Sequence, residues 1–431
     1  MAPTLPDGVA WPADGILDPA KVGRTSRNLS LYIHVPFCTV RCGYCDFNTY
    51  TVGFGPGASP ESYHQSVFRE IDLAAAVLAP YQHQPVQSIF VGGGTPTLLA
   101  SKHLGQIVEY AAQRFELADN CEITTEANPD SVDQKALETL AAAGFTRISF
   151  GMQSAVPHVL RTLDRTHDPK RINRVVKWAK QAGLATSLDL IYGTPGESLA
   201  DWEVSLTAAL AAETSHISTY ALVIEEGTKM WKDVQRGKLP LPDPDDEAAK
   251  YELADTLLTK AGFAWYEISN WARLVPGEQA GTTALQHASV HNLAYWRDDD
   301  WWGIGPGAHS HLGNLRWWNR KHPRAWAQAL TGNGVDGFDG SHKGGGLASP
   351  AQAGEELLPA DRALERFLLQ IRTADGLAVS EVDPQLRGRI PALIGQDLLS
   401  MEGNPNQGEA VITLTLAGRL LADYVTRELT V

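Results

Sequence analysis

Short apolar segments alternate with amphipathic, helix-like segments over residues 31–222. This alternation is typical of consecutive βα units that form a parallel sheet. Six consecutive βα units predict a partial or full barrel, and such folds place their functional residues at the C-terminal ends of the strands. The expected strands are residues 31–35, 87–93, 122–127, 147–152, 186–193 and 216–222.

Composition limits the classes of function. A chain of 431 residues, 43% hydrophobic and 20% charged, is ordinary for a globular protein with one large core and a smaller one. The formal net charge of −14 argues against nucleic-acid binding, which uses a basic surface. Four cysteines without paired spacing favour a reducing, cytoplasmic location. No segment approaches the roughly 18 consecutive apolar residues of a membrane span, so we expect no transmembrane segment and leave peripheral membrane contact open.

Apolar periodicity and local composition divide the chain into five segments. Residues 1–29 lack the apolar core of a secretory signal and are expected to form a loosely packed N-terminal arm. Residues 30–230 are the barrel core, and residues 231–330 are a Trp-rich extension. Residues 331–352 are rich in Gly and Ser and predict a linker or long loop. Residues 353–431 predict a smaller, mainly helical domain of winged-helix type.

Three of the four cysteines lie within eight positions, directly after the first expected strand. They are Cys38, Cys42 and Cys45, with the spacing C-x3-C-x2-C. Three soft thiolates held this close favour an iron–sulfur cluster or a thiophilic metal. Structural zinc would need a fourth ligand, and none follows promptly. A four-iron cluster with three protein thiolates would leave one iron open to a small molecule, whereas the isolated Cys121 is expected to be a small buried hydrophobe.

The segment LYIHVPFCTVRCGYCDF, residues 31–47, resembles the radical S-adenosylmethionine (SAM) superfamily. That superfamily has the same cysteine spacing, with an aromatic residue before the last cysteine. The resemblance implies an α/β fold with a partial (β/α)6 barrel, a [4Fe–4S] cluster, and SAM that chelates the open iron. Within the superfamily, the segment is most similar to the branch of oxygen-independent coproporphyrinogen III dehydrogenase and its heme-chaperone paralogues. The resemblance covers about residues 30–325, and the C-terminal tail more loosely.

Polar residues and glycines follow the other expected strands. Glycines after the second strand let main chain approach a ligand without Cβ interference. Four further polar groups carry both charge signs and converge at the same mouth, which suits a zwitterionic, ribose-bearing cofactor, although each alone is more simply structural. By resemblance, the SAM-binding positions are Tyr32, Tyr44, Gly93, Gly94, Thr95, Glu126, Gln153, Arg165, Asp189, Ala221 and His309.

Position 47 distinguishes the two functions of the resembled branch. The dehydrogenases carry a fourth cysteine there, whereas this chain has Phe47, which has no ligating atom. The chain matches the heme-chaperone pattern instead, so no catalytic residue is predicted and dehydrogenase activity is in doubt.

A second distinguishing segment is H-N-x-x-Y-W, residues 291–296, which resembles the heme-binding signature of the chaperones. A neutral imidazole is a good axial ligand for heme iron, so His291 is the candidate heme ligand. The alternative, that His291 is a hydrogen-bonded core residue, stays open. Residues that would cover the macrocycle or pair with its propionates are Trp296, Trp301, Trp302, Trp317, Trp318, Arg297, Arg316 and Arg320.

The sequence therefore predicts a protein that binds a [4Fe–4S] cluster, SAM and heme, and that delivers heme as cargo to an acceptor hemoprotein. An electron donor for the cluster is a further expected partner, nucleic acid is not, and dimerisation stays open. The alternative function is the oxidative decarboxylation of coproporphyrinogen III to protoporphyrinogen IX by a radical SAM oxidoreductase. Both hypotheses use the same barrel mouth, and heme binding by the reconstituted protein separates them.

Overall fold

The computed structural model describes residues 6–23, 27–81, 83–331, 348–403 and 410–431. Its main element is a curved sheet of 13 strands in the order β1-β13-β12-β11-β10-β2-β3-β4-β5-β6-β7-β9-β8. Neighbouring strands from β2 to β7 are parallel, which confirms the predicted barrel of βα units. These strands are β2 (Leu29–Val35), β3 (Val86–Gly93), β4 (Leu117–Ala127), β5 (Arg147–Gln153), β6 (Ala185–Tyr192) and β7 (His216–Ala221).

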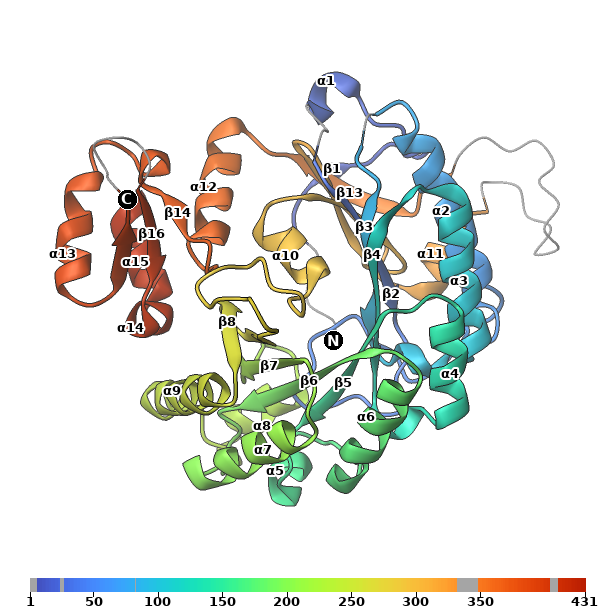
Figure 1. The fold of residues 1–431 in the computed structure, drawn as a ribbon. Helices are drawn as coiled ribbons and strands as arrows, with labels where there is room; N and C mark the ends of the chain where they lie inside the picture. The colour runs from blue at the N-terminus through green and yellow to red at the C-terminus, as the bar shows by residue number, and fades with distance from the viewer. Residues whose placement is uncertain (1–5, 24–26, 82, 332–347, 404–409) are drawn as a thin grey trace.

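Helices follow the parallel strands and lie on the outer face of the sheet (Figure 1). Local sequence signals fix their ends. Asp133 accepts a hydrogen bond from the N–H of Ala136 at the start of α4, and Ser198 and Asp201 form a capping box at the start of α7. The helices are α2 (Tyr63–Leu78), α3 (Ser101–Arg114), α4 (Gln134–Ala142), α5 (Pro157–Thr162), α6 (Ile172–Gln181) and α7 (Leu199–Ala211).

The Trp-rich extension adds strands at both edges of the parallel part of the sheet, beside β7 and beside β2. β9 (Asn270–Arg273) pairs antiparallel with β7, and β8 (Phe263–Glu267) pairs with β9. On the other side, β10 (Asp300–Ile304) pairs parallel with β2. The remaining elements here are α8 (Lys229–Gln235), α9 (Pro244–Lys260), α10 (Val290–Trp296), β11 (His309–Leu312), β12 (Leu315–Asn319) and α11 (Pro323–Ala329). Figure 1 shows α10 on the inner side of the curved sheet.

The described part of the N-terminal arm is anchored to the large sheet at a few residues, and most of its residues are exposed. β1 (Val9–Ala10) pairs with β13 (Ala351–Glu356), and the α1 helix (Pro19–Val22) follows it. The ring of Trp11 stacks on Trp317 at 5.3 Å between centroids. The arm is held by apolar contacts with residues some 300 positions away, which local sequence does not encode.

The second core starts later than predicted. The predicted boundary at residue 353 falls inside β13, which belongs to the large sheet, and most of the predicted linker lies outside the described residues. A separate apolar cluster runs from Phe367 to Leu429. Its elements, at the left of Figure 1, are α12 (Pro359–Gln370), β14 (Leu377–Ala378), α13 (Ile390–Gly395), β15 (Leu399–Glu402), β16 (Val411–Leu414), α14 (Leu416–Leu420) and α15 (Ala422–Thr430), with the strands in the order β14-β16-β15.

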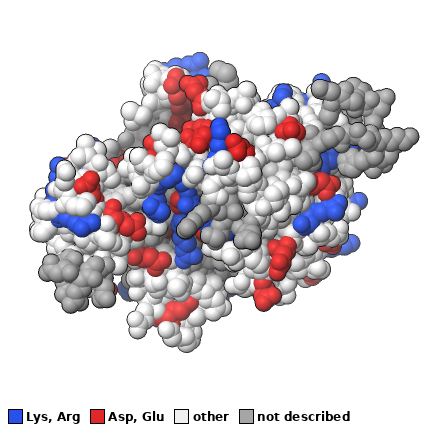
Figure 2. All heavy atoms as spheres, turned by 90° about the horizontal axis from the view of Figure 1, so that it is seen from above, with Lys and Arg blue, Asp and Glu red and all other residues white. Residues whose placement is uncertain are grey.

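The surface charges on one face are mixed in sign. In Figure 2, which views the molecule from above, Lys and Arg side chains lie among Asp and Glu side chains and form no continuous basic surface among the described residues of that face. Among the described residues, no helix is long and apolar enough to cross a bilayer.

A buried ion pair joins the end of α10 to the C-terminal core. Nη2 of Arg362, on α12, lies 2.6 Å from Oδ2 of Asp298, and the two side chains are 9% and 5% exposed. Arg27 also contacts this carboxylate, at 3.2 Å. Removing Arg362 would leave this buried carboxylate with only the longer contact to the more exposed Arg27, and breaking a buried pair in this way is costly.

We therefore expect Arg362→Met to destabilise the chain by about 3 kcal/mol, measured as a lower midpoint of urea-induced unfolding. The matched control is Arg366→Met on the same helix. Its partner Glu381 lies 3.8 Å away, and both side chains are more than 40% exposed, so the loss should stay below about 1 kcal/mol. Equal losses in the two variants would contradict the structural role of the buried pair.

Candidate cofactor site

The three clustered cysteines lie on the loop that follows β2, referred to below as the cysteine loop (residues 36–50). The N–H of Cys38 donates to the carbonyl of Tyr50 at 2.9 Å, and the N–H of Tyr50 donates to the carbonyl of Pro36 at 2.7 Å, which closes the ends of the loop. The N–H of Cys45 donates to the carbonyl of Cys42 at 3.2 Å. All three thiols are partly exposed, and all three residues line one cavity of about 570 Å³.

The glycine-rich end of β3 supports the cysteine loop through main-chain contacts. The N–H of Gly94 donates to the carbonyl of Val35 at 2.8 Å, and the N–H of Thr95 donates to the carbonyl of Phe37 at 2.7 Å. A Cβ on Gly94 would lie 2.5 Å from the Phe37 oxygen and 3.0 Å from Sγ of Cys38. Glycine is therefore required where β3 approaches the loop.

Two carboxylates lie on the cavity wall. Oε2 of Glu126 accepts a hydrogen bond from the N–H of Gly93 at 2.9 Å, and Oδ2 of Asp189 accepts one from Oγ of Ser149 at 2.7 Å. Burial, together with the nearby charge of Asp189, raises the pKa of Glu126 to about 7. Burial also raises the pKa of Asp189. Both carboxylates have lost solvation, so a cationic ligand between them would be favoured.

Gln153 and Arg165 lie together at the end of β5. Gln153 has φ of 59°, a left-handed conformation that is strained for a residue with a side chain and is common at functional sites. Nη2 of Arg165 donates to the carbonyl of Gly151 at 3.0 Å, and Nη1 donates to Sγ of Cys42 at 3.8 Å. The guanidinium therefore places a positive charge next to one of the three thiols.

The cavity brings together most of the residues expected from the sequence. They are Cys38, Cys42, Cys45, Tyr32, Tyr44, Gly93, Gly94, Thr95, Glu126, Gln153, Arg165, Asp189, Ala221 and His291. His309 is the exception and corrects the expectation. It lies on β11, where its carbonyl accepts a hydrogen bond from Nε1 of Trp301 at 3.0 Å and its ring stacks on Trp318 at 5.6 Å, outside the cavity lining.

The sequence reasoning missed several lining residues in the barrel interior. They include Phe90, Thr124, Arg147, Ser187, His216 and Ser218, which lie on strands β3 to β7. Arg41, on the cysteine loop at the rim, was missed as well. The position of a residue within its strand could have identified those in the interior. Residues at alternate strand positions share one face, so Ser187 points to the same side of β6 as the predicted Asp189.

His291 is buried, with 2% of its surface exposed, and both of its ring nitrogens have partners. Nδ1 lies 2.8 Å from Oγ of Ser88, and Nε2 lies 3.1 Å from the hydroxyl of Tyr295. The ring stacks on Phe90 at 4.9 Å with an interplanar angle of 18°. Burial lowers the pKa of His291 to about 3, so the imidazole is neutral at physiological pH.

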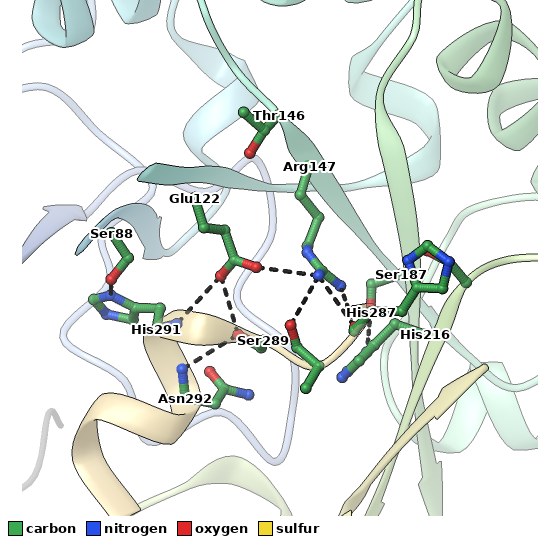
Figure 3. Close-up of polar contacts among 12 residues, drawn as sticks. Ser88, Glu122, Thr146, Arg147, Ser187, His216, His287, Ser289, His291 and Asn292 are labelled. Carbon is green, nitrogen blue, oxygen red and sulfur yellow. Dashed lines mark hydrogen bonds and ion pairs between the residues drawn. The ribbon is translucent and has the colours of Figure 1, made fainter. Parts of the chain in front are cut away.

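A buried ion pair fixes the start of α10 against the barrel (Figure 3). Nη2 of Arg147 lies 3.1 Å from Oε2 of Glu122, and both side chains are 7% exposed. Oε1 of Glu122 accepts a hydrogen bond from the N–H of His291 at 3.2 Å. The guanidinium of Arg147 also donates to the carbonyls of His287 and Ala288 at 3.1 Å. Strands β4 and β5 therefore hold the helix that carries His291.

Four of the eight aromatic and basic residues expected to surround heme are occupied elsewhere. Trp302, Trp317 and Trp318 are buried under the β10–β12 part of the sheet, with 4% or less of their surface exposed. Arg316 pairs with Glu355 and Glu365 at 3.3 and 2.7 Å. These four residues therefore pack and stabilise the sheet. β12 places Arg316, Trp317 and Trp318 between β11 and β13, and Trp302 lies on β10.

The donor set of the cysteine loop suits a multi-iron cluster. Within the described ranges, no three His, Cys, Asp or Glu side chains are grouped closely enough to hold one metal ion. Iron–sulfur clusters are bound by cysteine thiolates, and each thiolate binds a different iron. Three thiols that line a shared space fit that requirement, and burial raises the pKa of Cys38 to about 11, so cluster binding would displace its proton.

The barrel, the cysteine loop and the shared cavity define a radical SAM protein, and the family described as the radical SAM superfamily matches residues 32–209. Two relatives extend the match over nearly the whole chain. Heme chaperone HemW of Mycobacterium tuberculosis is 44% identical over 402 residues, which cover 93% of this chain and 94% of that protein. Heme chaperone HemW of Bacillus subtilis is 30% identical and covers 92% and 97% of the two chains. The chain belongs to the HemW family.

One solved structure shares the fold of both parts of the chain. Coproporphyrinogen III oxidase (HemN) from Escherichia coli, a radical SAM enzyme, aligns with a TM-score of 0.74 over 95% of this chain and 92% of that chain. The two sequences are 21% identical. This likeness establishes a common architecture and carries no conclusion about activity.

The raised pKa of Glu126 predicts a pH-dependent stability. The ordinary pKa of 4.5 rises to about 7 on folding, so the folded chain keeps a proton that the unfolded chain loses between these values. The stabilising contribution is complete below pH 4.5 and is lost as the pH rises through 7. Glutamine still accepts the hydrogen bond from Gly93 but cannot ionise.

We therefore expect Glu126→Gln to match the parent chain near pH 4.5 and to become progressively more stable than it up to about pH 7. Urea unfolding of the cluster-free chain over a pH series measures this difference. Glu109→Gln, at an exposed position on α3, is the control and should follow the parent. A stability gain for Glu126→Gln that does not change with pH would contradict the assigned titration.

Proposed function

We propose that this chain is a heme chaperone. It binds a [4Fe–4S] cluster through Cys38, Cys42 and Cys45, binds SAM at the open iron, and holds heme for delivery to an acceptor hemoprotein. The observation that carries the proposal is that one cavity is lined by the three thiols, the polar residues suited to SAM, and the imidazole of His291. Membership of the HemW family supports the same function.

In the proposed SAM site, different groups on the cavity wall bind different parts of the SAM molecule. When bound, the cluster supplies an open iron that chelates the amino and carboxylate groups of SAM. Main chain at Gly93–Thr95 lies beside the cysteine loop and lines the cavity, where it would contact the methionyl part. Glu126 and Asp189 are desolvated carboxylates that favour the positive charge of the ligand, and Arg165 balances the thiolates and the ligand carboxylate.

We propose that the chain has no coproporphyrinogen dehydrogenase activity. Phe47 lines the rim of the cavity and is 56% exposed, at the position where the dehydrogenase pattern has a cysteine. A phenyl group can neither ligate iron nor relay a proton or electron. It does present apolar surface at the entrance, where a macrocycle would pass.

The remaining assignments concern partners and location. We propose an electron donor for the cluster, an acceptor hemoprotein and a cytoplasmic location. The location is supported by the free thiols of the cysteine loop, which an oxidising compartment would expose to disulfide formation. Dimerisation and peripheral membrane contact are compatible with this proposal and are not required by it.

The cluster assignment predicts different outcomes for two cysteine variants. Cys42→Ala should bind little iron and sulfide after anaerobic reconstitution and should lack the visible absorption of the cluster. Cys121→Ala is the matched control, because Cys121 is buried on β4 away from the cavity lining, and it should retain the full cluster. Zinc in place of iron, or an unchanged cluster in Cys42→Ala, would refute the assignment.

The heme assignment predicts that His291→Ala weakens heme binding by roughly tenfold or more, equivalent to about 1.4 kcal/mol, and shifts the Soret band because the axial ligand is lost. His287→Ala is the matched control. Its side chain lies four residues earlier, outside the cavity lining, and only its carbonyl supports Arg147. Identical Soret spectra and affinities for His291→Ala and the parent would make His291 a purely structural residue.

A further inference from the structure

We infer that SAM and heme exclude one another from this cavity, so that SAM binding opposes the ligation of heme by His291. The inference rests on the proposed function and concerns how its two ligands share one site. It follows from the access route to His291, from the side chains that the two ligands would share, from the size of the cavity, and from its charge.

Access to His291 runs through the cavity. The residue is 2% exposed, and its Nδ1 faces Ser88, which has no exposed surface and does not line the cavity. Its Nε2 faces the hydroxyl of Tyr295, which does line the cavity. An iron atom therefore reaches Nε2 from the cavity side, where it takes the place of the Tyr295 hydroxyl.

The wall next to His291 is also the wall of the proposed SAM site. The ring of Tyr32, one of the SAM positions, lies 6.3 Å from the ring of His291 and 6.4 Å from that of Phe90. Phe90 in turn stacks on His291 at 4.9 Å. A porphyrin is wider than any of these separations, so a macrocycle bound to His291 extends over Tyr32 and Phe90 into the space of the nucleotide.

The volume of the cavity also indicates that SAM and heme cannot both occupy it. It holds about 570 Å³, between the thiols at one end and His291 at the other. Cavities of roughly 300–1,000 Å³ each hold one drug-sized ligand. SAM and heme are each at least of that size, so the cavity has room for one of them in this conformation.

The charges of the two ligands are opposite. SAM carries a sulfonium and an ammonium, which the desolvated carboxylates of Glu126 and Asp189 favour. Heme carries two propionates, which the same carboxylates repel when they are ionised. The competition is therefore electrostatic as well as steric, and the propionates have to stay near the mouth, where Arg41 lines the rim.

Because the two ligands compete for one space, each should weaken the apparent affinity of the chain for the other by a predictable factor. SAM at about one hundred times its own dissociation constant should weaken the apparent affinity for heme about 100-fold. By reciprocity, saturating heme should weaken SAM binding by a comparable factor. In cells, departure of SAM would then accompany heme loading, and return of SAM would accompany heme release.

The test uses the anaerobically reconstituted full chain with its cluster oxidised, so that SAM is bound without being cleaved. Hemin is titrated with and without saturating SAM, and the Soret band gives the apparent dissociation constant. In parallel, equilibrium dialysis measures how much radiolabelled SAM the chain retains as hemin is added. The cluster-free Cys42→Ala variant is the control for direct contact between SAM and hemin, since SAM should not alter its heme affinity.

The expected result is an apparent dissociation constant for hemin that rises in proportion to SAM, with loss of bound SAM as hemin saturates. An unchanged hemin affinity together with full retention of SAM would overturn the inference and leave the proposed function standing. Failure of the chain to bind hemin in the absence of SAM would instead overturn the proposed function itself. Tighter hemin binding in the presence of SAM would show that the two ligands cooperate and would also overturn the inference.

Discussion

Two main-chain hydrogen bonds between the end of β3 and the start of the cysteine loop determine the position of the whole site. The N–H groups of Gly94 and Thr95 donate to the carbonyls of Val35 and Phe37, so the sheet and not the loop itself fixes the thiols. Val35 pairs with Gly93 in the parallel register of β2 and β3. Glu126, at the end of the next strand, is held by Gly93 in the same way, which sets the carboxylate relative to the thiols.

Helix α10 is held at both ends by buried ion pairs. At its start, Glu122 and Arg147 connect it to β4 and β5, and after its end Asp298 connects it to Arg362 of α12. Buried pairs contribute little net stability, because desolvation offsets their attraction, but breaking one is costly. The geometry of His291 therefore depends on both the barrel and the C-terminal core, and a movement of either would change what this residue contacts.

The sequence predicts the parts of this site that follow from strand periodicity. Parallel strands end at one edge, so Glu126 and Gln153 at strand ends and Asp189 within a strand are expected in one cavity, and all three line it. His309 lies outside the cavity lining because β11 pairs antiparallel with β10 across a short loop, and its ring turns toward Trp318. The packing of Trp11 on Trp317 joins segments some 300 positions apart, which no local pattern encodes.

Burial gives His291 two opposing properties, and together they suit a carrier of heme. It keeps the imidazole neutral, which is the form that ligates iron, because the low polarity around the ring penalises its charged form. It also commits both nitrogens to hydrogen bonds, so an iron ligand has to replace the Tyr295 hydroxyl, a contact worth about 0.5–1.5 kcal/mol. That cost lowers heme affinity by a modest factor without blocking ligation. A protein that must give up its cargo benefits from such a built-in competitor, whereas a permanent hemoprotein would keep its axial nitrogen free.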